Sequence, residues 1–263
     1  MKVIYLGPEG SYSNIAAKKI SKDIYPFDTI DDIFDEVEKN QDVLGVVPVE
    51  NSIEGSVSVT LDLLLQKNVY IIKEIILDIK HYLCYKINKK ISSIASHPQA
   101  LSQCHEYLRN NFENAKIISA QSTSHAAKLC FEGYVDAAIC SYEASKIYNL
   151  DIFYGPINNN NMTRFFVIHN KPLFEKRHNN KTSLIFSTYN KPGSLYKILA
   201  IFDLWDINLT KIESRPSKKE LGQYIFYIDV EGFYDDENIS EALKIIKRKT
   251  TFYKFLGSYD IEK

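Results

Sequence analysis

The stretch Val43-Leu-Gly-Val-Val-Pro-Val-Glu-Asn-Ser-Ile-Glu-Gly-Ser56 joins an apolar run to a polar turn. Val43 to Val49 is apolar almost without interruption, which predicts a strand buried on both faces. After the turn, Leu61, Leu64 and Leu65 are apolar positions of an expected helix. A strand, a polar turn and a helix in this order indicate a mainly parallel sheet covered by helices.

The same order of segments recurs several times in the chain. Apolar runs at Val3 to Leu6, Ile94 to Ser96, Ile117 to Ala120 and Ala137 to Cys140 each lead into a polar turn and an expected helix. Ligands of such sheets bind where the strands end, so the polar turns form the candidate site. These turns carry Ser11, Asn51, Ser96 and Ser122. A strand-like region from Val69 to Lys86 and a return near Asn159 predict two lobes around one cleft.

The return segment, Asn159 to Ile168, has the sequence Asn-Asn-Asn-Met-Thr-Arg-Phe-Phe-Val-Ile. The asparagines from Asn158 to Asn161 favour a solvated loop, whereas Phe165 to Ile168 favours a buried strand. Thr163 and Arg164 therefore stand at a junction of loop and strand, where scaffolds carry reactive groups. The hydroxyl could donate to a leaving oxygen beside a guanidinium that binds a carboxylate. A surface threonine beside a salt-bridged arginine is the alternative.

Several polar groups have two interpretations at this level. Ser11 or Ser13 either faces an anion at a helix N-terminus or caps the helix. The Glu50-Asn51-Ser52 turn serves either catalysis or the start of a helix. His97 and His125 lack recognisable partners, so we expect structural roles for both. Cys104 and His105 are adjacent on an expected helix and point apart, which disfavours a nucleophilic pair.

Composition limits the function classes. The formal net charge of the 263 residues is -1, which argues against a nucleic-acid partner. The cysteines, Cys84, Cys104, Cys130 and Cys140, are far apart in the sequence, and no leader or long apolar span precedes Lys2. We therefore expect a cytoplasmic, reduced protein with no metal and no membrane partner.

The character of the chain changes after a linker-like segment from Lys171 to Lys181. The pattern beyond it predicts a strand, a helix, two strands, a helix and a strand. These segments are Thr182 to Thr188, a helix opened by Pro192-Gly-Ser-Leu195, Leu209 to Ser214, Tyr224 to Val230, a helix marked by Ile239, Leu243 and Ile246, and Phe252 to Tyr259. This order is that of the ferredoxin-like split unit.

Motifs along the whole chain resemble the prephenate dehydratase family. The catalytic part matches at Gly7-Pro-Glu-Gly-Ser-Tyr-Ser13, Val46-Val-Pro-Val-Glu-Asn-Ser-Ile-Glu-Gly-Ser-Val57, Ser96-His-Pro-Gln-Ala100, Ser122-Thr-Ser-His-Ala-Ala127 and Thr163-Arg-Phe165. The tail is similar to a regulatory ACT domain at Pro192-Gly-Ser-Leu195 and Glu213-Ser-Arg-Pro216. No helical segment precedes the catalytic part, so the resemblance is to the monofunctional form without a fused chorismate mutase.

The resemblance implies a two-lobed fold like that of periplasmic binding proteins, followed by a ferredoxin-like ACT domain. The expected catalytic domain covers residues 1–175, with lobe one at about 1–77 and 160–175 and lobe two at about 78–159. Residues 176–181 are the expected linker and 182–263 the ACT domain. The implied activity is conversion of prephenate to phenylpyruvate in phenylalanine biosynthesis, without a cofactor, and arogenate dehydratase is the alternative. A non-catalytic amino-acid sensor is a further alternative, which the presence of Thr163 disfavours.

The resemblance also implies the site residues. The expected catalytic residues are Thr163, Glu50, Asn51, Ser96 and Gln103, and the expected substrate-binding residues are Ser11, Ser122, Arg164 and Phe165. Phenylalanine, as allosteric inhibitor, is expected to bind at Gly193, Ser194, Leu195, Asn208, Leu209, Glu213, Ser214, Arg215 and Pro216. ACT domains generally pair edge to edge, which implies a homodimer or homotetramer. Tyr196 departs from the aliphatic residue common in the glycine motif, so the effector affinity stays open.

Overall fold

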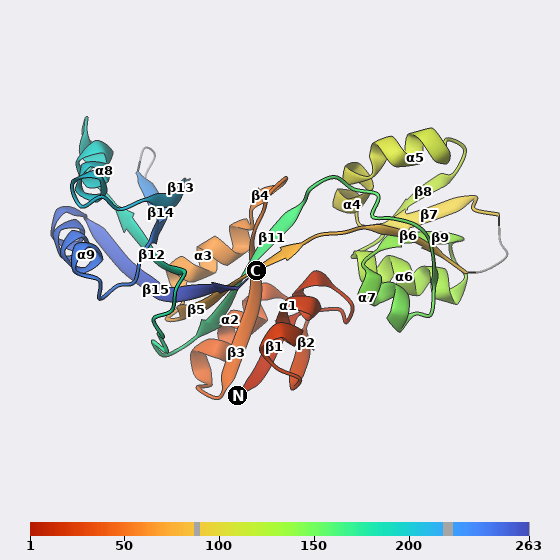
Figure 1. Cartoon of the computed structure of the whole chain (residues 1–263), viewed down its shortest axis with the longest axis horizontal. Coiled ribbons are helices and arrows are strands. Elements are labelled where there is room, and N and C mark those ends of the chain that lie inside the picture. The colour runs from red at the N-terminus through yellow and green to blue at the C-terminus, as the bar shows by residue number, and fades with distance from the viewer. Residues whose placement is uncertain (87–89, 218–222, 263) are drawn as a thin grey trace. The chain divides into compact units, whose positions relative to one another are not determined.

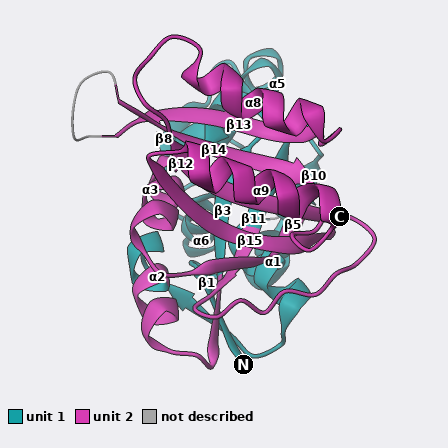
Figure 2. Ribbon diagram, turned by 90° about the vertical axis from the view of Figure 1, so that its left-hand side faces the viewer, with its two compact units in different colours: residues 1–33, 46–57, 76–165 teal, residues 34–45, 58–75, 166–263 magenta. Residues whose placement is uncertain are grey.

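The computed structural model describes residues 1–86, 90–217 and 223–262 (Figure 1). The chain divides into two compact units, which Figure 2 distinguishes by colour. Unit 1 comprises residues 1–33, 46–57 and 76–165, and unit 2 comprises residues 34–45, 58–75 and 166–263. Unit 1 thus holds nearly all of the polar turns, and unit 2 combines the C-terminal segment with parts of the first half of the chain.

Unit 1 has two lobes, the first of which contains the N-terminus. Its elements are β1 (Lys2–Leu6), α1 (Tyr12–Ile20), β2 (Ile24–Phe27) and β4 (Gly55–Ser56), and four further elements contribute residues to both units: α2 (Ile30–Lys39), β3 (Val43–Asn51), β5 (Tyr70–Asp78) and β11 (Met162–His169). The strand order is β5-β11-β3-β1-β2. The apolar run of β3 is largely buried, as its sequence predicts, and α2 buries Ile33, Phe34 and Val37 at helical spacing.

The second lobe of unit 1 is built on a five-stranded sheet in the order β10-β6-β9-β7-β8. Its elements are β6 (Tyr82–Tyr85), β7 (Ser93–Ser96), α4 (Pro98–Gln103), α5 (His105–Asn111), β8 (Lys116–Ser119), α6 (Thr123–Glu132), β9 (Ala137–Cys140), α7 (Tyr142–Ile147) and β10 (Asp151–Tyr154). Strand β7 is parallel to β8 and β9, whereas β6 is antiparallel to β9 and β10. The sheet is therefore mixed, and the two-lobed α/β architecture expected from the sequence is confirmed.

Two segments that cross between these lobes bind each other through asparagine side chains. The amide nitrogen of Ile79 donates to the Asn161 carbonyl at 2.7 Å. The amide nitrogen of His81 donates to Asn158 Oδ1 at 2.7 Å, and Asn158 Nδ2 donates to the Ile79 carbonyl at 2.6 Å. The expectation of a merely solvated loop is wrong for Asn158 and Asn161, because the Asn158 side-chain amide and the Asn161 backbone carbonyl replace strand pairing between the end of β5 and the start of β6.

Unit 2 contains the ferredoxin-like segment in the predicted order. Its elements are α3 (Ser58–Gln66), β12 (Asn180–Ser187), α8 (Ser194–Leu204), β13 (Leu209–Pro216), β14 (Tyr224–Glu231), α9 (Glu237–Lys249) and β15 (Phe252–Glu262), with strand order β13-β14-β12-β15-β5. Helices α8 and α9 bury Ile198, Phe202, Ile239 and Ile246 against one face of the sheet. Strand β15 continues the sheet by parallel pairing with β5, which no sequence pattern indicated.

Helix α3 binds the face of this sheet that α8 and α9 leave open. The Tyr227 hydroxyl donates to the Leu61 carbonyl at 3.0 Å. Lys254 Nζ donates to the carbonyls of Leu64 and Leu65, at 2.7 and 3.1 Å, at the C-terminal end of α3. An ammonium group at that end opposes the helix dipole favourably, while burial lowers the pKa of Lys254 to about 8.

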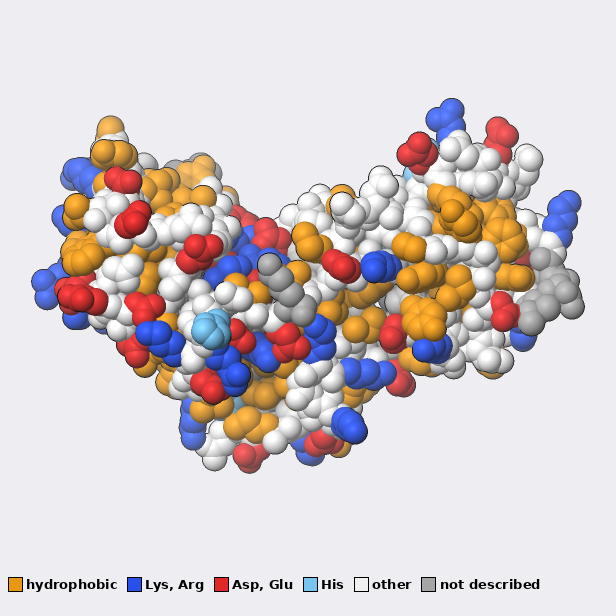
Figure 3. Space-filling model, viewed as in Figure 1, with side chains coloured by type: hydrophobic (Ala, Val, Ile, Leu, Met, Phe, Trp, Pro, Cys, Tyr) orange, Lys and Arg blue, Asp and Glu red, His pale blue; other side chains and the backbone are white. Residues whose placement is uncertain are grey.

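Charged side chains of both signs are interspersed over the face shown in Figure 3, in keeping with the net charge of -1. Among the described residues, no helix has the length and apolar character needed to cross a membrane.

We predict that Gly257→Ala destabilises the protein strongly. Gly257 has φ +147°, and a Cβ there would lie 2.2 Å from the Ile71 carbonyl oxygen in unit 2. Backbone strain and overpacking together should lower the free energy of unfolding by about 2–5 kcal/mol. Gly133→Ala is the control, because Gly133 has φ +84° in open space and should cost only about 1–2 kcal/mol. Urea unfolding measures both, and equal losses would contradict the close approach of the two backbones.

Candidate active site

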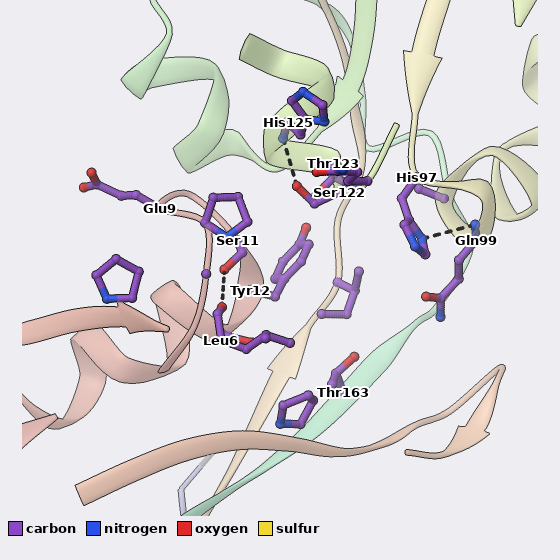
Figure 4. A pocket seen from close by; sticks show the side chains of 18 of the residues that line it. Leu6, Glu9, Ser11, Tyr12, His97, Gln99, Ser122, Thr123, His125 and Thr163 are labelled. Atoms are coloured by element: carbon purple, nitrogen blue, oxygen red, sulfur yellow. Dashed lines mark hydrogen bonds between the residues drawn. The ribbon is translucent and has the colours of Figure 1, made fainter. Parts of the chain in front are cut away.

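The polar turns of both lobes of unit 1 surround one cleft of about 890 Å³. Its wall includes Ser11, Asn51, Gln103, Ser122, Thr163 and Phe165 from the sequence-predicted set, together with His81, His97, His125 and Asn161. Figure 4 shows Ser11, Tyr12, His97, Ser122 and Thr163 around this space. The structure therefore brings together residues as far apart in the sequence as Ser11 and Phe165.

Two of the helices that begin at this cleft, α1 and α6, are each capped by a serine. Ser11 Oγ accepts from the Asn14 amide at 3.2 Å and donates to the Leu6 carbonyl at 3.3 Å. Ser122 Oγ accepts from the His125 amide at 2.9 Å. The capping interpretation of Ser11 is thereby confirmed. An anion at α1 or α6 would meet the first backbone N–H groups, which have no intrahelical partner, rather than a free serine hydroxyl.

Thr163 lies at the start of β11 and is bound by the amide of Asn51. Asn51 Nδ2 donates to Thr163 Oγ1 at 2.8 Å and to Asn161 Oδ1 at 2.7 Å. Asn51 Oδ1 accepts from the backbone amides of Ile53 and Glu54, at 3.0 and 3.2 Å. The Thr163 oxygen is thus an acceptor within the protein. No residue in the described part of the chain accepts from its hydroxyl, so its hydrogen is available to a ligand.

The polar chain continues from Asn161 to Gln103 and His81. Asn161 Nδ2 donates to Gln103 Oε1 at 2.8 Å, and His81 Nε2 lies 3.1 Å from the same oxygen. His81 is only 4% exposed, and burial lowers the pKa of its imidazole to about 4. The ring is therefore neutral near pH 7. Since an amide oxygen only accepts, the ring proton sits on Nε2.

Hydrogen bonds also join the two lobes across the Gly7–Ser11 loop. Ser141 Oγ donates to the Gly10 carbonyl at 2.8 Å, and Ser124 Oγ donates to the Glu9 carbonyl. The Tyr12 hydroxyl donates to the Lys80 carbonyl at 2.6 Å and accepts from the Lys80 amide at 2.9 Å. These contacts hold the helix starts of the two lobes on opposite sides of one cleft.

Three of the residues predicted for catalysis or substrate binding, Glu50, Ser96 and Arg164, are not part of the wall of the cleft. Arg164 Nη1 lies 2.6 Å from Glu50 Oε2, so the guanidinium is neutralised within the protein rather than free to bind a carboxylate. Ser96 is fully buried, and its hydroxyl donates to the Ile139 carbonyl at 2.7 Å. This geometry matches the alternative of a salt-bridged arginine beside the threonine and favours structural roles for Glu50 and Ser96. The substrate-binding role of Arg164 and the catalytic roles of Glu50 and Ser96 stay predictions.

His97 and the cysteines have the structural positions that their sequence context predicted. His97 caps α4, where its Nδ1 accepts from the Gln99 amide at 3.4 Å. Cys104 is buried between α4 and α5, while His105 is exposed, so the two side chains do point apart. All four cysteines are buried free thiols. Burial raises the pKa of Cys104 to about 12, which makes a thiolate nucleophile there unfavourable.

Sequence reasoning missed His81 and Asn161. His81 stands in a strand-like run, and Asn161 is one of several neighbouring asparagines. Neither position carries a local pattern of its own, since each side chain acquires its partner from a distant segment. The only available signal was the interruption of the apolar run after Ile79 by two polar residues.

The fold and the cleft define a two-lobed protein that binds a small molecule between its lobes. A ferredoxin-like domain follows the lobes in the chain. The prephenate dehydratase family model matches residues 3–173, and the ACT domain model matches residues 182–248. The chain belongs to the prephenate dehydratase family, and the expectation of a prephenate dehydratase with an ACT domain is confirmed.

Similar proteins include a prephenate dehydratase of Methanocaldococcus jannaschii, 46% identical over 98% of this chain and 98% of the relative. An arogenate dehydratase/prephenate dehydratase of Arabidopsis thaliana is 36% identical over 100% of this chain and 73% of the relative. Among solved structures, a prephenate dehydratase of Arthrobacter aurescens in complex with L-Phe has a TM-score of 0.89 at 28% identity, over 99% of this chain and 90% of that one.

We predict that the buried neutral His81 makes the protein less stable in acid. The unfolded chain takes up a proton at this imidazole as pH falls through about 6.5, whereas the folded protein does so only near 4. The contribution of His81 to the free energy of unfolding is therefore fully present above about pH 6.5 and is lost as the pH falls toward 4. At about 1.4 kcal/mol per pKa unit, the loss is on the order of 3 kcal/mol.

Urea unfolding of the wild type and of His81→Gln, each at pH 7.5 and pH 4.5, measures this contribution. The glutamine cannot titrate, so the variant should lose less stability between the two pH values. An equal loss in both proteins would show that other groups carry the acid sensitivity.

Proposed function

We propose that the cleft of unit 1 is the active site of this prephenate dehydratase and that Thr163 donates to the leaving oxygen. The observation that carries the proposal is the bond from Asn51 Nδ2 to Thr163 Oγ1, which directs the hydroxyl hydrogen away from the protein. Thr163 lines the cleft, where a substrate oxygen would be its acceptor. The reaction makes the enzyme a carbon–oxygen lyase.

The chemistry needs no external electron acceptor. As the bond to the ring carboxylate of prephenate breaks, its electron pair enters the ring, the hydroxyl group leaves with its own pair, and carbon dioxide and phenylpyruvate form. The leaving oxygen takes a proton to become water. Because the ring becomes aromatic, the reaction is strongly downhill, and the enzyme contributes mainly by positioning and by donating to the developing oxyanion.

Two carboxylates of the substrate must also be held. The start of α1 lies on one side of the cleft and the start of α6 on the other, and both present backbone N–H groups. Lys128 also lines the cleft. These groups replace Arg164 as the proposed carboxylate ligands, since the charge of Arg164 is balanced by Glu50.

Arogenate dehydratase is the second candidate activity, because a similar plant protein carries both names. Arogenate bears an ammonium group where prephenate has a keto group. Turnover measured side by side on prephenate and arogenate decides between the two. A lack of turnover on either substrate would favour the non-catalytic amino-acid sensor instead.

We propose that phenylalanine inhibits the enzyme by binding the ACT domain, as a similar solved protein is a complex with L-Phe. Gly193 precedes α8 with φ +76° in open space, so its backbone is accessible to an amino acid. The expected effector residues Asn208, Ser214 and Pro216 are exposed. Along β13, however, the side chains alternate, so Glu213 and Arg215 face α3 while Ser214 and Pro216 face the other way.

This alternation suggests how an effector signal reaches the catalytic part. Arg215 Nη2 lies 3.0 Å from Asp62 Oδ1 on α3, and both side chains are mostly buried. Helix α3 follows β4, the short strand that comes after Asn51 and its turn. A ligand at one face of β13 would therefore act on a strand whose other face binds a helix close in the chain to Asn51.

Pairing of ACT domains into a homodimer or homotetramer, and a cytoplasmic location, stay predictions. Strand β13 is the outermost strand of its sheet among the described residues, so it offers an unpaired edge.

We predict that Thr163→Ala lowers kcat for prephenate by a factor of about 10²–10³, the usual loss for one transition-state donor. Substrate binding should change less, because Thr163 is only one of the polar groups lining the cleft. Steady-state kinetics on a variant with a wild-type unfolding curve makes the measurement. Retention of most of the turnover would remove Thr163 from the mechanism.

We predict that Asp62→Asn weakens inhibition by phenylalanine while leaving kcat and KM for prephenate within about twofold of the wild type. Effector and substrate are typically coupled by about 1–3 kcal/mol, and loss of the Arg215 ion pair should remove part of it. Inhibition curves measure the effect, with Asp235→Asn as a control at an exposed acidic residue of the same domain. Unchanged inhibition would show that the effect of phenylalanine does not depend on the ion pair between Arg215 and Asp62.

A further inference from the structure

His81 has features that a structural role alone does not explain. It is buried and lines the wall of the cleft, and its ring packs edge-on against Tyr12 at a centroid distance of 6.2 Å. Its backbone is fixed on both sides, by Asn158 Oδ1 and by the Ile157 amide. Its Nδ1 is buried without a partner among the described residues. Within the described part of the chain, Gln103 Oε1 is the only polar contact of the ring.

The amides between Thr163 and His81 can adopt only one orientation. Asn51 cannot turn over, because its Oδ1 accepts from two backbone N–H groups. Its Nδ2 therefore faces Asn161 Oδ1, which directs Asn161 Nδ2 toward Gln103 Oε1. Reversal of Gln103 would bring two NH₂ groups together and also set one against the His81 N–H.

The groups presented to the cleft are consequently donors. Gln103 Oε1 accepts from two sides, and no described residue accepts from Gln103 Nε2. The Thr163 hydroxyl is in the same situation at the other end of the chain of amides. Two donors facing the cleft suit a substrate with two carboxylates and a leaving hydroxide.

We propose that His81 is a positioning residue for the dehydration: its neutral ring donates from Nε2 to Gln103 and holds the Gln103 NH₂ group toward the substrate. Without His81, one hydrogen bond from Asn161 would hold a side chain with three rotatable bonds, and an adjacent space would open. The Gln103 amide would then occupy several positions. This inference rests on the proposed role of the cleft.

The test compares four variants of the full chain with prephenate as substrate. His81→Leu removes the donor and should lower kcat about 10- to 100-fold, the scale of loss for a misplaced catalytic group, with a smaller change in KM. His81→Gln can place an amide nitrogen near the position of Nε2 and should restore most of the activity. His81→Asn is equally polar but too short to reach Gln103, so it should resemble His81→Leu. If His81→Leu does not fold, His81→Asn supplies the same comparison with His81→Gln.

The fourth variant supplies a matched control. His169→Gln changes another buried histidine, 1% exposed, whose ring contacts the carbonyls of Lys171 and Gln41 and does not line the cleft. Its kcat should stay within about twofold of the wild type, the change expected away from the site. Thermal unfolding of each variant separates a loss of positioning from a loss of fold.

A double-mutant cycle identifies the route of the effect. In a Gln103→Leu background, His81→Leu should change kcat by less than about twofold, because its only proposed route is already absent. Fully additive losses would overturn the proposal, as would wild-type kcat in folded His81→Leu. If His81→Gln were as inactive as His81→Leu, proton transfer by the imidazole would replace positioning. Inactivity of the wild type itself would instead refute the proposed function.

Discussion

The two hydrogen bonds from the Ile53 and Glu54 amides to Asn51 Oδ1 fix the direction of every polar contact along one wall of the cleft. Backbone amides cannot exchange donor for acceptor, so the orientation of Asn51 is set by the turn after β3. Asn51 donates to Thr163 on one side. On the other side it donates to Asn161, which in turn donates to Gln103. A local turn thus determines which groups a substrate meets, which is pre-organisation in the sense used for oxyanion sites.

A second constraint keeps these residues in one place. They come from three separate segments of unit 1, and one of these segments, Asn158 to Thr163, crosses Ile79 to His81. Regular strand pairing is interrupted at the crossing, and the Asn158 side chain and the Asn161 carbonyl supply partners for the backbone there. The side chain of Asn161, in the same segment, continues into the polar chain. The crossing is therefore both the connection between the lobes and part of the site.

Local patterns predicted much of this architecture. The burial of β3, the cap at Ser11 and the βαββαβ order of the tail all depend on neighbouring residues, and the structure has them where the sequence placed them. Strand β10 was missed because all four of its residues are exposed, so no alternation marks it. The Glu50 to Arg164 ion pair joins residues 114 positions apart, and a sequence gives no indication of which charge neutralises which. The function of His81 was inaccessible for the same reason.

The arrangement of unit 2 shows why a regulatory segment can influence a catalytic one without sharing its cleft. One cross-strand row of the sheet contains Glu213, Tyr227, Ile185 and Lys254. Tyr227 and Lys254 of this row bind carbonyls of α3, and Arg215, two residues beyond Glu213 on the same face, binds Asp62. Since these contacts reach both the backbone and a side chain of α3, the helix is held to the sheet at several points. In the chain, α3 follows β4 and the turn that orients Asn51. The proposed effector site on β13 would therefore act through α3 on the segment that leads back to Asn51.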